Sequence, residues 1–167
     1  MRAMCAAALA LAAGCLESPP SGEPVTVFDA DVTPDATPCP ESAAVCVTEQ
    51  GSGHTYAAFN PHFSWDDAVE QCEQRGWYLA TDRGQVESFL IQGLLPEPVW
   101  VGATDEAIDD DWRWVTGEPF DYTHWRSGEP NGETSANCLL ANWENQGWSD
   151  EDCAVASAYV CETGPGE

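Results

Sequence analysis

Apolar residues recur at helical spacing in the segment that follows Ser64. The positions i, i+3, i+4 and i+7 are occupied by Trp65, Ala68, Val69 and Cys72. This spacing places them on one face of a helix. Ser64 and Asp67 form a variant capping box at its start, with Asp in place of Glu, and Gly76 ends it. The pattern therefore predicts an amphipathic helix that begins near Trp65.

A second helical pattern opens near Asp82 and ends at Gly93 and Pro96. The apolar residues that this helix is expected to bury are Val86, Phe89 and Leu90. Short apolar segments around the two helices predict strands over Tyr56 to Phe59, Tyr78 to Ala80, Val99 to Gly102, Trp112 to Val115, Cys138 to Ala141 and Ala158 to Cys161. Two early helices among scattered strands predict an α+β fold.

The amino-terminal region has the pattern of an export signal. Residues 1–14 contain one basic residue, Arg2, and an apolar run too short to span a bilayer. Ala12-Ala13-Gly14-Cys15 resembles the lipobox of bacterial lipoproteins, which makes Cys15 the predicted lipidation site. An ordinary secretory signal is the alternative. We expect an exported protein of the bacterial cell envelope whose only membrane contact is this lipid anchor.

The rest of the chain divides into three expected parts. Residues 15–38 are rich in Pro and Asp and predict a semi-extended tether. A folded domain is expected over residues 39–162, followed by a short tail over 163–167. The whole chain has 167 residues, enough for one domain of ordinary size and a leader.

Composition narrows the classes of function. Eight cysteines indicate an oxidising compartment. A formal net charge of −24 disfavours nucleic acid and anionic membrane surfaces as partners. His54, His62 and His124 are scattered without ligand spacing, and no nucleophile motif occurs. We therefore expect a binding protein rather than an enzyme.

A series of motifs along the chain resembles the C-type lectin domain. In order, these motifs are Cys72, Trp100-Val101-Gly102-Ala103, Trp112-Arg113-Trp114, Glu129-Pro130-Asn131, Cys138, Trp148-Ser149-Asp150, Cys153 and Tyr159-Val160-Cys161-Glu162. Their joint order and spacing carry the resemblance, which covers about residues 51–162. It implies a C-type lectin-like domain with two helices, a mixed or antiparallel sheet and a long loop region closed by a disulfide.

The resemblance also implies how the cysteines of the domain pair. The implied bridges are Cys72–Cys161 and Cys138–Cys153. Cys39 and Cys46 would then join each other, as in the longer forms of the family. The first bridge would tie the first helix to the last strand, and the second would close the long loop. A zinc site is disfavoured because no Cys-x-x-Cys spacing occurs and the compartment is oxidising.

The same resemblance implies a calcium and carbohydrate site at the loop that begins at Glu129. Glu129, Asn131 and Asp150 carry the carboxylate and amide oxygens that calcium prefers. In the family, the peptide bond before the proline that matches Pro130 is cis, which turns the flanking side chains toward one ion. Two vicinal sugar hydroxyls then donate to carboxylates and accept from amides. Glu-Pro-Asn resembles the mannose, glucose and fucose type rather than the galactose type.

Two positions depart from the family pattern. Ala136 stands where the family has a carboxylate, and Glu133 is the candidate replacement ligand. Ser149 stands where the family has an asparagine that ligates calcium, and its hydroxyl is a poorer ligand. We therefore expect a calcium affinity no tighter than the weak extracellular class, ~10⁻⁴–10⁻³ M.

Neighbouring residues offer further candidates. Asp105 and Asp109 resemble positions that hold an auxiliary calcium in some family members. They also belong to an acidic run, Asp105-Glu106 and Asp109–Asp111, for which a solvated turn is the preferred interpretation. Trp143 lies in the loop between the second pair of cysteines and is either a sugar-stacking residue or a packed anchor.

These observations support two hypotheses for the function. The first is calcium-dependent recognition of mannose-type glycans, with Glu129, Asn131 and Asp150 shared between ion and sugar. The second is calcium-independent binding of a protein ligand, or a structural role in the cell envelope, with a degenerate lectin site.

Overall fold

The computed structural model describes residues 39–142 and 146–164. The predicted leader and tether over residues 1–38, the predicted lipidation site Cys15 and the candidate sugar-stacking residue Trp143 lie outside the described residues. Within the described part of the chain, none of the helices has the length and apolar character needed to cross a membrane.

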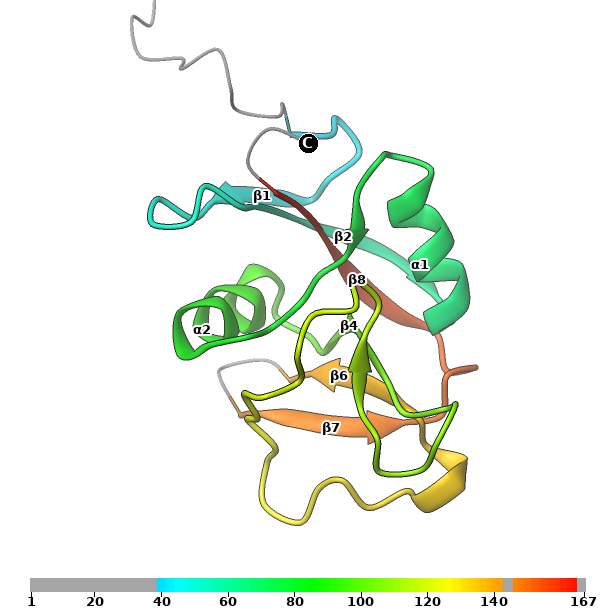
Figure 1. Ribbon diagram of the computed structural model, residues 1–167. Coiled ribbons are helices and arrows are strands. Elements are labelled where there is room, and N and C mark those ends of the chain that lie inside the picture. The colour runs from blue at the N-terminus through cyan, green and yellow to red at the C-terminus, as the bar shows by residue number, and fades with distance from the viewer. Residues whose placement is uncertain (1–38, 143–145, 165–167) are drawn as a thin grey trace, which may run out of the picture. The chain divides into compact units, whose positions relative to one another are not determined.

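Over residues 39–142 and 146–164, strands and two helices together form an α+β domain (Figure 1). The strands are β1 (Val45–Thr48), β2 (Thr55–Phe63), β3 (Tyr78–Leu79), β4 (Val99–Thr104), β5 (Arg113–Trp114), β6 (Cys138–Ala141), β7 (Trp148–Glu151) and β8 (Ser157–Thr163). The helices are α1 (Trp65–Glu73) and α2 (Gln85–Leu94), and a short 3-10 helix, η1, covers Glu133–Ser135. The predicted fold class is confirmed.

The strands named above belong to one mixed sheet. Its main path runs β1-β2-β8-β4-β6-β7, with β3 paired to β8 and β5 paired to β4. The pairing of β4 with β8 is parallel, and the other pairings are antiparallel. The last strand of the chain therefore lies in the middle of the sheet, and β7, which carries the Trp-Ser-Asp motif, lies at one end of it.

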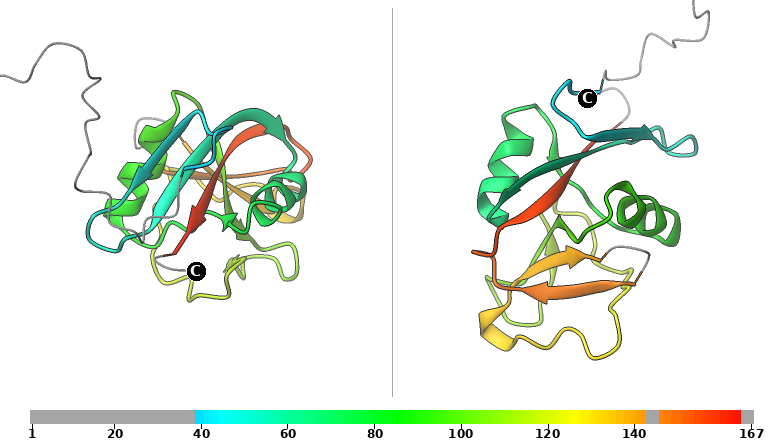
Figure 2. Two further views of the ribbon diagram at one scale, coloured as in Figure 1. Left: turned by 90° about the horizontal axis from the view of Figure 1, so that it is seen from above. Right: turned by 180° about the vertical axis from the view of Figure 1, so that it is seen from behind.

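Two apolar clusters pack against opposite faces of this sheet. Side chains of β2 alternate between them, with Tyr56 and Ala58 in one cluster and Ala57 and Phe59 in the other. The second cluster includes the buried residues of α1, and the first includes Ile91 of α2 and the aromatic residues around Trp148. Figure 2 shows α1 and α2 on opposite sides of the β2 and β8 pair.

Helix α1 forms where its apolar spacing predicts. The buried residues of α1 are Trp65, Ala68 and Cys72, and Val69 is partly buried against the same cluster. Ser64 accepts a hydrogen bond from the backbone N–H of Asp67 at 3.2 Å, and its hydroxyl donates to Asp67 Oδ2 at 2.6 Å. The predicted capping residue is confirmed, because one orphan N–H of the first turn is satisfied by a side chain.

Helix α2 turns a different face inward from the one predicted. Val86 and Phe89 are 66% and 70% exposed, so the prediction that they are buried is wrong, whereas Leu90 is partly buried. The buried residues of this helix are Ser88, Ile91 and Gln92. Two of these are polar because they hydrogen-bond beneath the helix: Gln92 Nε2 donates to Ser88 Oγ at 2.7 Å, and the backbone N–H of Gly147 donates to Gln92 Oε1 at 3.1 Å.

Two strands of the sheet are not predicted by the sequence pattern. β1 is a short strand at the edge of the sheet, half-buried along most of its length, so it has little apolar alternation. β7 reads Trp-Ser-Asp-Glu, in which three of the four residues are polar. Tertiary contacts bury Ser149 and Asp150 of β7 all the same.

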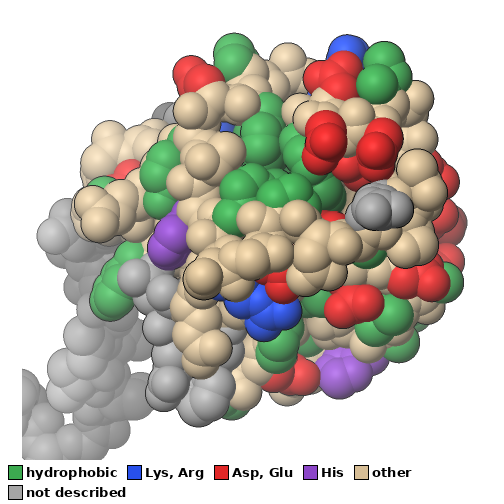
Figure 3. Space-filling view, turned by 90° about the horizontal axis from the view of Figure 1, so that it is seen from below, with side chains coloured by type: hydrophobic (Ala, Val, Ile, Leu, Met, Phe, Trp, Pro, Cys, Tyr) green, Lys and Arg blue, Asp and Glu red, His purple; other side chains and the backbone are tan. Residues whose placement is uncertain are grey.

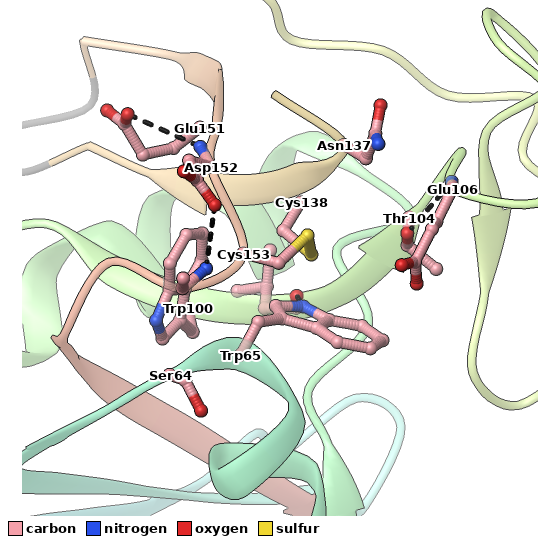
Figure 4. Close-up of a disulfide and its surroundings, with 12 residues drawn as sticks. Ser64, Trp65, Trp100, Thr104, Glu106, Asn137, Cys138, Glu151, Asp152 and Cys153 are labelled. Atoms are coloured by element: carbon pink, nitrogen blue, oxygen red, sulfur yellow. Dashed lines mark hydrogen bonds between the residues drawn. A yellow bond between two sulfur atoms is a disulfide. The ribbon is translucent and has the colours of Figure 1, made fainter. Parts of the chain in front are cut away.

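The described residues contain three disulfides. The pairs are Cys39–Cys46, Cys72–Cys161 and Cys138–Cys153, the same three pairings that the resemblance implies. Figure 4 shows the third of these with Trp65 and Trp100. The backbone N–H of Trp65 donates to the Cys153 carbonyl at 2.9 Å, and its indole N–H donates to the Val101 carbonyl at 2.8 Å. The start of α1 therefore holds both this disulfide loop and β4.

Candidate functional site

The Glu-Pro-Asn loop forms a tight turn before η1. The peptide bond between Glu129 and Pro130 is cis. The turn begins at Arg126, whose carbonyl accepts a hydrogen bond from the Glu129 N–H at 3.1 Å. The Asn131 side-chain amide donates to Glu129 Oε2 at 2.6 Å. The side chains on the two sides of Pro130 therefore meet, as the resemblance implies.

Asp150 of β7 joins this loop to the sheet. Its carboxylate accepts the backbone N–H of Asn131 at 2.9 Å and 3.0 Å, and the backbone N–H of Gly132 at 2.6 Å. Gly132 has no room for a side chain: a Cβ there would lie 2.0 Å from the Cβ of Ala136 and 2.9 Å from Asp150 Oδ2. The structure thus brings Glu129, Asn131 and Asp150 together.

The two carboxylates of this group have opposite pKa shifts. Burial raises the pKa of Glu129, and the adjacent Asp150 carboxyl raises it further, although Arg126 acts against this. Burial alone would also raise the pKa of Asp150, but the N–H groups of Asn131 and Gly132 and the Glu129 carboxyl outweigh it, and this pKa is lowered. Asp150 is therefore the carboxylate that stays ionised more readily, and a cation between the two would relieve their repulsion.

A hollow of about 290 Å³ lies beside the loop. Its walls are Asp105, Asp109, Asp110, Pro130, Asn131 and Asp150. The two candidates for an auxiliary metal site therefore face the same space as two of the principal candidates. Figure 3 shows the end of the molecule that carries the long loop, where acidic side chains outnumber cationic ones. Four carboxylates around one hollow make a strongly negative environment.

Asp105 is buried, although the sequence predicts that it belongs to a solvated acidic turn. Only 4% of the residue is exposed, so the solvated interpretation is wrong at this position, whereas Glu106, Asp109 and Asp110 are exposed. Asp105 Oδ2 accepts the backbone N–H of Asp110 at 2.9 Å, but its Oδ1 is buried and accepts no hydrogen bond from the described residues. Burial raises the pKa of Asp105, and the charges of Asp109 and Asp110 raise it further. A bound water or ion is one explanation for a buried carboxylate oxygen that has no donor.

The remaining candidates are placed differently. Ser149 is 4% exposed, and its hydroxyl accepts the side-chain amide of Asn142 at 3.1 Å. It is not among the residues that line the hollow. Ala136 packs against Gly132, and the backbone of Glu133 begins η1, whereas the side chain of Glu133 lies outside the description.

The carboxylate and amide oxygens of the residues around the hollow do not converge on one point. Among residues 39–142 and 146–164, no group of three or more His, Cys, Asp or Glu side chains is arranged closely enough to hold a metal ion. The hydrogen bonds explain this, because Glu129 and Asp150 both point toward donors of the loop itself. The donor set nevertheless fits calcium, which takes several carboxylate and amide oxygens in a flexible shell. Metal binding would require these side chains to exchange internal donors for the ion.

Comparison with known proteins identifies the family. The model of the lectin C-type domain matches residues 62–163, more than half of the 167-residue chain. The chain belongs to the C-type lectin domain family. Domains of this family are binding modules, in agreement with the expectation that this protein is not an enzyme.

Two relatives illustrate the extent of the sequence similarity. The chain is 32% identical over 111 residues to the Homo sapiens C-type mannose receptor 2, covering 64% of this chain and 8% of the receptor. It is 31% identical over 133 residues to Salivary C-type lectin 2 of Aedes albopictus, covering 70% of this chain and 88% of that protein. The similarity to the receptor is thus to a small part of a much longer protein.

Solved structures show the same fold. The mouse scavenger receptor C-type lectin carbohydrate-recognition domain has a TM-score of 0.65 at 23% identity, covering 76% of this chain and 97% of that one. A calcium-independent type II antifreeze protein has a TM-score of 0.66 at 23% identity, covering 76% of this chain and 95% of that one. The fold therefore occurs with different ligands, and the function has to be argued from the site.

Three residues of the site are absent from the candidates that the sequence supplies. Asp110 lines the hollow, Gly132 allows Asp150 to approach the loop, and Arg126 pairs with Glu129. The sequence does contain one signal for the last of these: Arg126 is an isolated cation three residues before Glu129 in a very acidic chain. Asp110 belongs to the acidic run visible in the sequence, whereas the close approach of Asp150 at Gly132 depends on contacts between distant segments.

Proposed function

We propose that the protein binds a carbohydrate of the mannose type through the loop Glu129-Pro130-Asn131, with a calcium ion shared between protein and sugar. The observation that carries the proposal is the hollow beside this loop. Carboxylates from the β4–β5 connection and from β7 meet the Asn131 amide there, and Asp105 Oδ1 is buried without a donor.

Calcium is the cation that suits this donor set. The ligand atoms are carboxylate and amide oxygens, which favour a hard cation, and neither histidine nor free thiol lines the hollow. Asn131, Asp150 and Glu129 are the proposed principal ligands, and Asp105 and Asp109 the proposed auxiliary ones. Glu133 stays a candidate from the sequence alone. Ser149 is the weakest of the predicted ligands, because its hydroxyl is already bonded to Asn142.

The choice of sugar rests on the ligand types on the two sides of Pro130. A carboxylate accepts from a sugar hydroxyl and an amide donates to one, so the order Glu then Asn selects the geometry of a hydroxyl pair. The mannose-type resemblance of Glu-Pro-Asn agrees with the name of one relative, C-type mannose receptor 2. We propose Trp143 as an additional contact on the ligand.

A second function is supported by a different observation. Side chains of the loop hydrogen-bond to one another, as Asn131 and Arg126 both do to Glu129. Such a loop suits calcium-independent binding of a protein ligand or a structural role in a cell envelope, and one solved structure with this fold is described as calcium-independent.

The proposed location rests on the predicted export signal and on the cysteines. We propose an exported protein attached to a bacterial membrane through lipid on Cys15, with secretion as the alternative. The ligand is then a glycan or a protein at the cell exterior. Nucleic acid is disfavoured by the net charge of −24.

A calcium titration tests the first proposal. We expect the melting temperature of the purified protein to rise saturably with calcium and to return to its starting value with EGTA, because an ion that binds only the folded state stabilises it. The expected midpoint lies at ~10⁻⁴–10⁻³ M. An unchanged melting temperature up to ~10 mM calcium, well above that range, would contradict the calcium-lectin proposal and favour the second function.

Retention on mannose-agarose in the presence of calcium then tests whether the protein binds a mannose-type sugar. Asn131→Asp replaces the amide donor to Glu129 by a second carboxylate, so retention should be lost or its sugar selectivity changed. Binding of a protein ligand away from this loop should be unaffected. Asn137→Asp, which adds the same charge at a residue that does not line the hollow, is the matched control.

A further inference from the structure

Arg126 forms an ion pair with Glu129, one of the proposed principal ligands. Its Nε and Nη2 atoms both donate to Glu129 Oε1, at 3.0 Å and 2.8 Å. The other carboxylate oxygen, Oε2, accepts the Asn131 amide at 2.6 Å. Both oxygens of Glu129 are therefore occupied by donors from its own loop.

The two partners differ in their access to water. The side chain of Glu129 is 5% exposed, whereas that of Arg126 is 46% exposed. The backbone of Arg126 is fixed, because its N–H donates to the Trp148 carbonyl at 3.0 Å and its carbonyl closes the turn to Glu129. The guanidinium can therefore leave the carboxylate and enter water without any rearrangement of the turn, while Glu129 stays in place.

The charge balance shows what this pair does. Glu129 and Asp150 are adjacent carboxylates, and a positive group beside them lowers the cost of keeping both in a partly buried place. Among the described residues, the other three arginines pair elsewhere: Arg75 with Gln71, Arg83 with Glu87 and Glu118, and Arg113 with Asp111. Arg126 is thus the cation that the described chain supplies to this loop.

We propose that Arg126 is an internal counter-cation that competes with calcium for Glu129. With its guanidinium on Glu129, the loop is formed without metal, and calcium gains this ligand only when the guanidinium leaves. Arg126 therefore weakens calcium binding and with it the sugar binding that depends on the ion. This inference rests on the proposed calcium site, and it identifies the residue that sets the affinity of that site.

Calorimetric calcium titrations of the full chain and of Arg126→Gln test the inference. Removal of the guanidinium frees one oxygen of Glu129 and removes a repulsive charge, so we expect calcium to bind the variant roughly three- to tenfold more tightly, as suits an ion pair that is half exposed. The matched control is Arg113→Gln, which removes the same charge from a pair with Asp111 outside the hollow. Arg126→Lys keeps the charge and should stay close to wild type.

Thermal melting in EGTA supplies a readout that does not involve the metal. Arg126→Gln should lower the melting temperature without calcium and show a larger rise at saturation than wild type does. Tighter binding in Arg126→Gln but not in Arg113→Gln would support the inference. Measurable calcium binding by Arg126→Gln alone, with none by wild type, would also support the inference.

Two results would contradict the inference that Arg126 competes with calcium. Equal calcium affinity in wild type and Arg126→Gln, or weaker affinity in the variant, would show that Arg126 does not compete with the ion, while the proposed calcium site would stand. Absence of calcium binding in both proteins would remove the calcium site itself and the competition with it. The two failures are therefore distinguishable.

Discussion

Asp82 and Asp105 are both buried carboxylates with one oxygen that accepts no hydrogen bond from the described residues, but their surroundings differ. Asp105 is one of the residues that line the hollow beside the Glu-Pro-Asn loop. Asp82 lies inside the domain, where its Oδ2 accepts the indole N–H of Trp148 at 2.7 Å. Asp105 is therefore a proposed ligand, whereas Asp82 holds the tryptophan that starts β7.

Asp82 should make stability depend on pH. Burial raises the pKa of Asp82 to about 7 from its usual value of 3.8, so the folded protein binds a proton more tightly than the unfolded chain does. Its contribution is fully present below about pH 4 and is lost as the pH rises to 7, with a span on the order of 4 kcal/mol. Urea unfolding from pH 4.5 to pH 8 in EGTA should show this loss of unfolding free energy.

Asp82→Asn separates this residue from the other titrating groups. The amide oxygen still accepts from Trp148, but no charge forms at high pH, so the variant should gain stability relative to wild type as the pH rises. A difference between the two proteins that is constant over this range would mean that Asp82 is ionised throughout, and the prediction would be wrong.

At the scale of the element, α2 shows how a helix can have two candidate inward faces. Val86 and Phe89 are one turn apart, which is the usual pattern of a buried stripe, yet both are exposed. The inward face contains Ser88 and Gln92 because they bond to His124 and Gly147 beneath the helix, through Ser88 Oγ at 2.8 Å from His124 Nδ1 and Gln92 Oε1 at 3.1 Å from the Gly147 N–H. Hydrogen bonding rather than apolar spacing decides the orientation.

Matched alanine substitutions on α2 test this orientation. Phe89→Ala should change the free energy of unfolding by no more than about 0.5 kcal/mol, because the side chain is mostly in water. Ile91→Ala should cost about 2–5 kcal/mol, because Ile91 is fully buried and its loss leaves a cavity. Denaturant unfolding of both variants gives the comparison, and a larger loss for Phe89→Ala would restore the face that the sequence alone predicts.

At the scale of the whole molecule, the disulfides differ in the length of chain that they close. Cys72–Cys161 has a sequence separation of 89, whereas Cys39–Cys46 has a separation of 7. In the chain-entropy model, a longer closed loop stabilises more, because it removes more freedom from the unfolded chain. The long bridge also joins α1 to β8, the strand in the middle of the sheet.

Removal of each bridge should reveal this difference. The double substitution Cys72→Ala and Cys161→Ala should cost about 4 kcal/mol of unfolding free energy, and Cys39→Ala with Cys46→Ala about 2–3 kcal/mol at most. Each double variant lacks one disulfide and two cysteines, so each is a control for the other in denaturant unfolding. Equal losses would show that local packing, not loop length, sets the value of these bridges.

Sequence by itself determined much of this protein. The apolar spacing and cap of α1 are local features, and most strands follow from short apolar segments, so both could be predicted without the fold. The ordered motifs predicted the family, and the positions Glu129, Asn131 and Asp150 are in fact adjacent. Such features need only the chemistry of near neighbours in the chain, or a pattern that many residues carry together.

Tertiary structure decided the rest. The inward face of α2, the burial of Asp105, the close approach at Gly132 and the pairing of Arg126 with Glu129 all depend on which distant segments meet. Whether a polar group is desolvated, and which partner satisfies it, is a property of three-dimensional contacts that no local pattern contains. For that reason the sequence indicated the proposed ligands, whereas the contact of Arg126 with Glu129, on which the proposed competition rests, came from the structure.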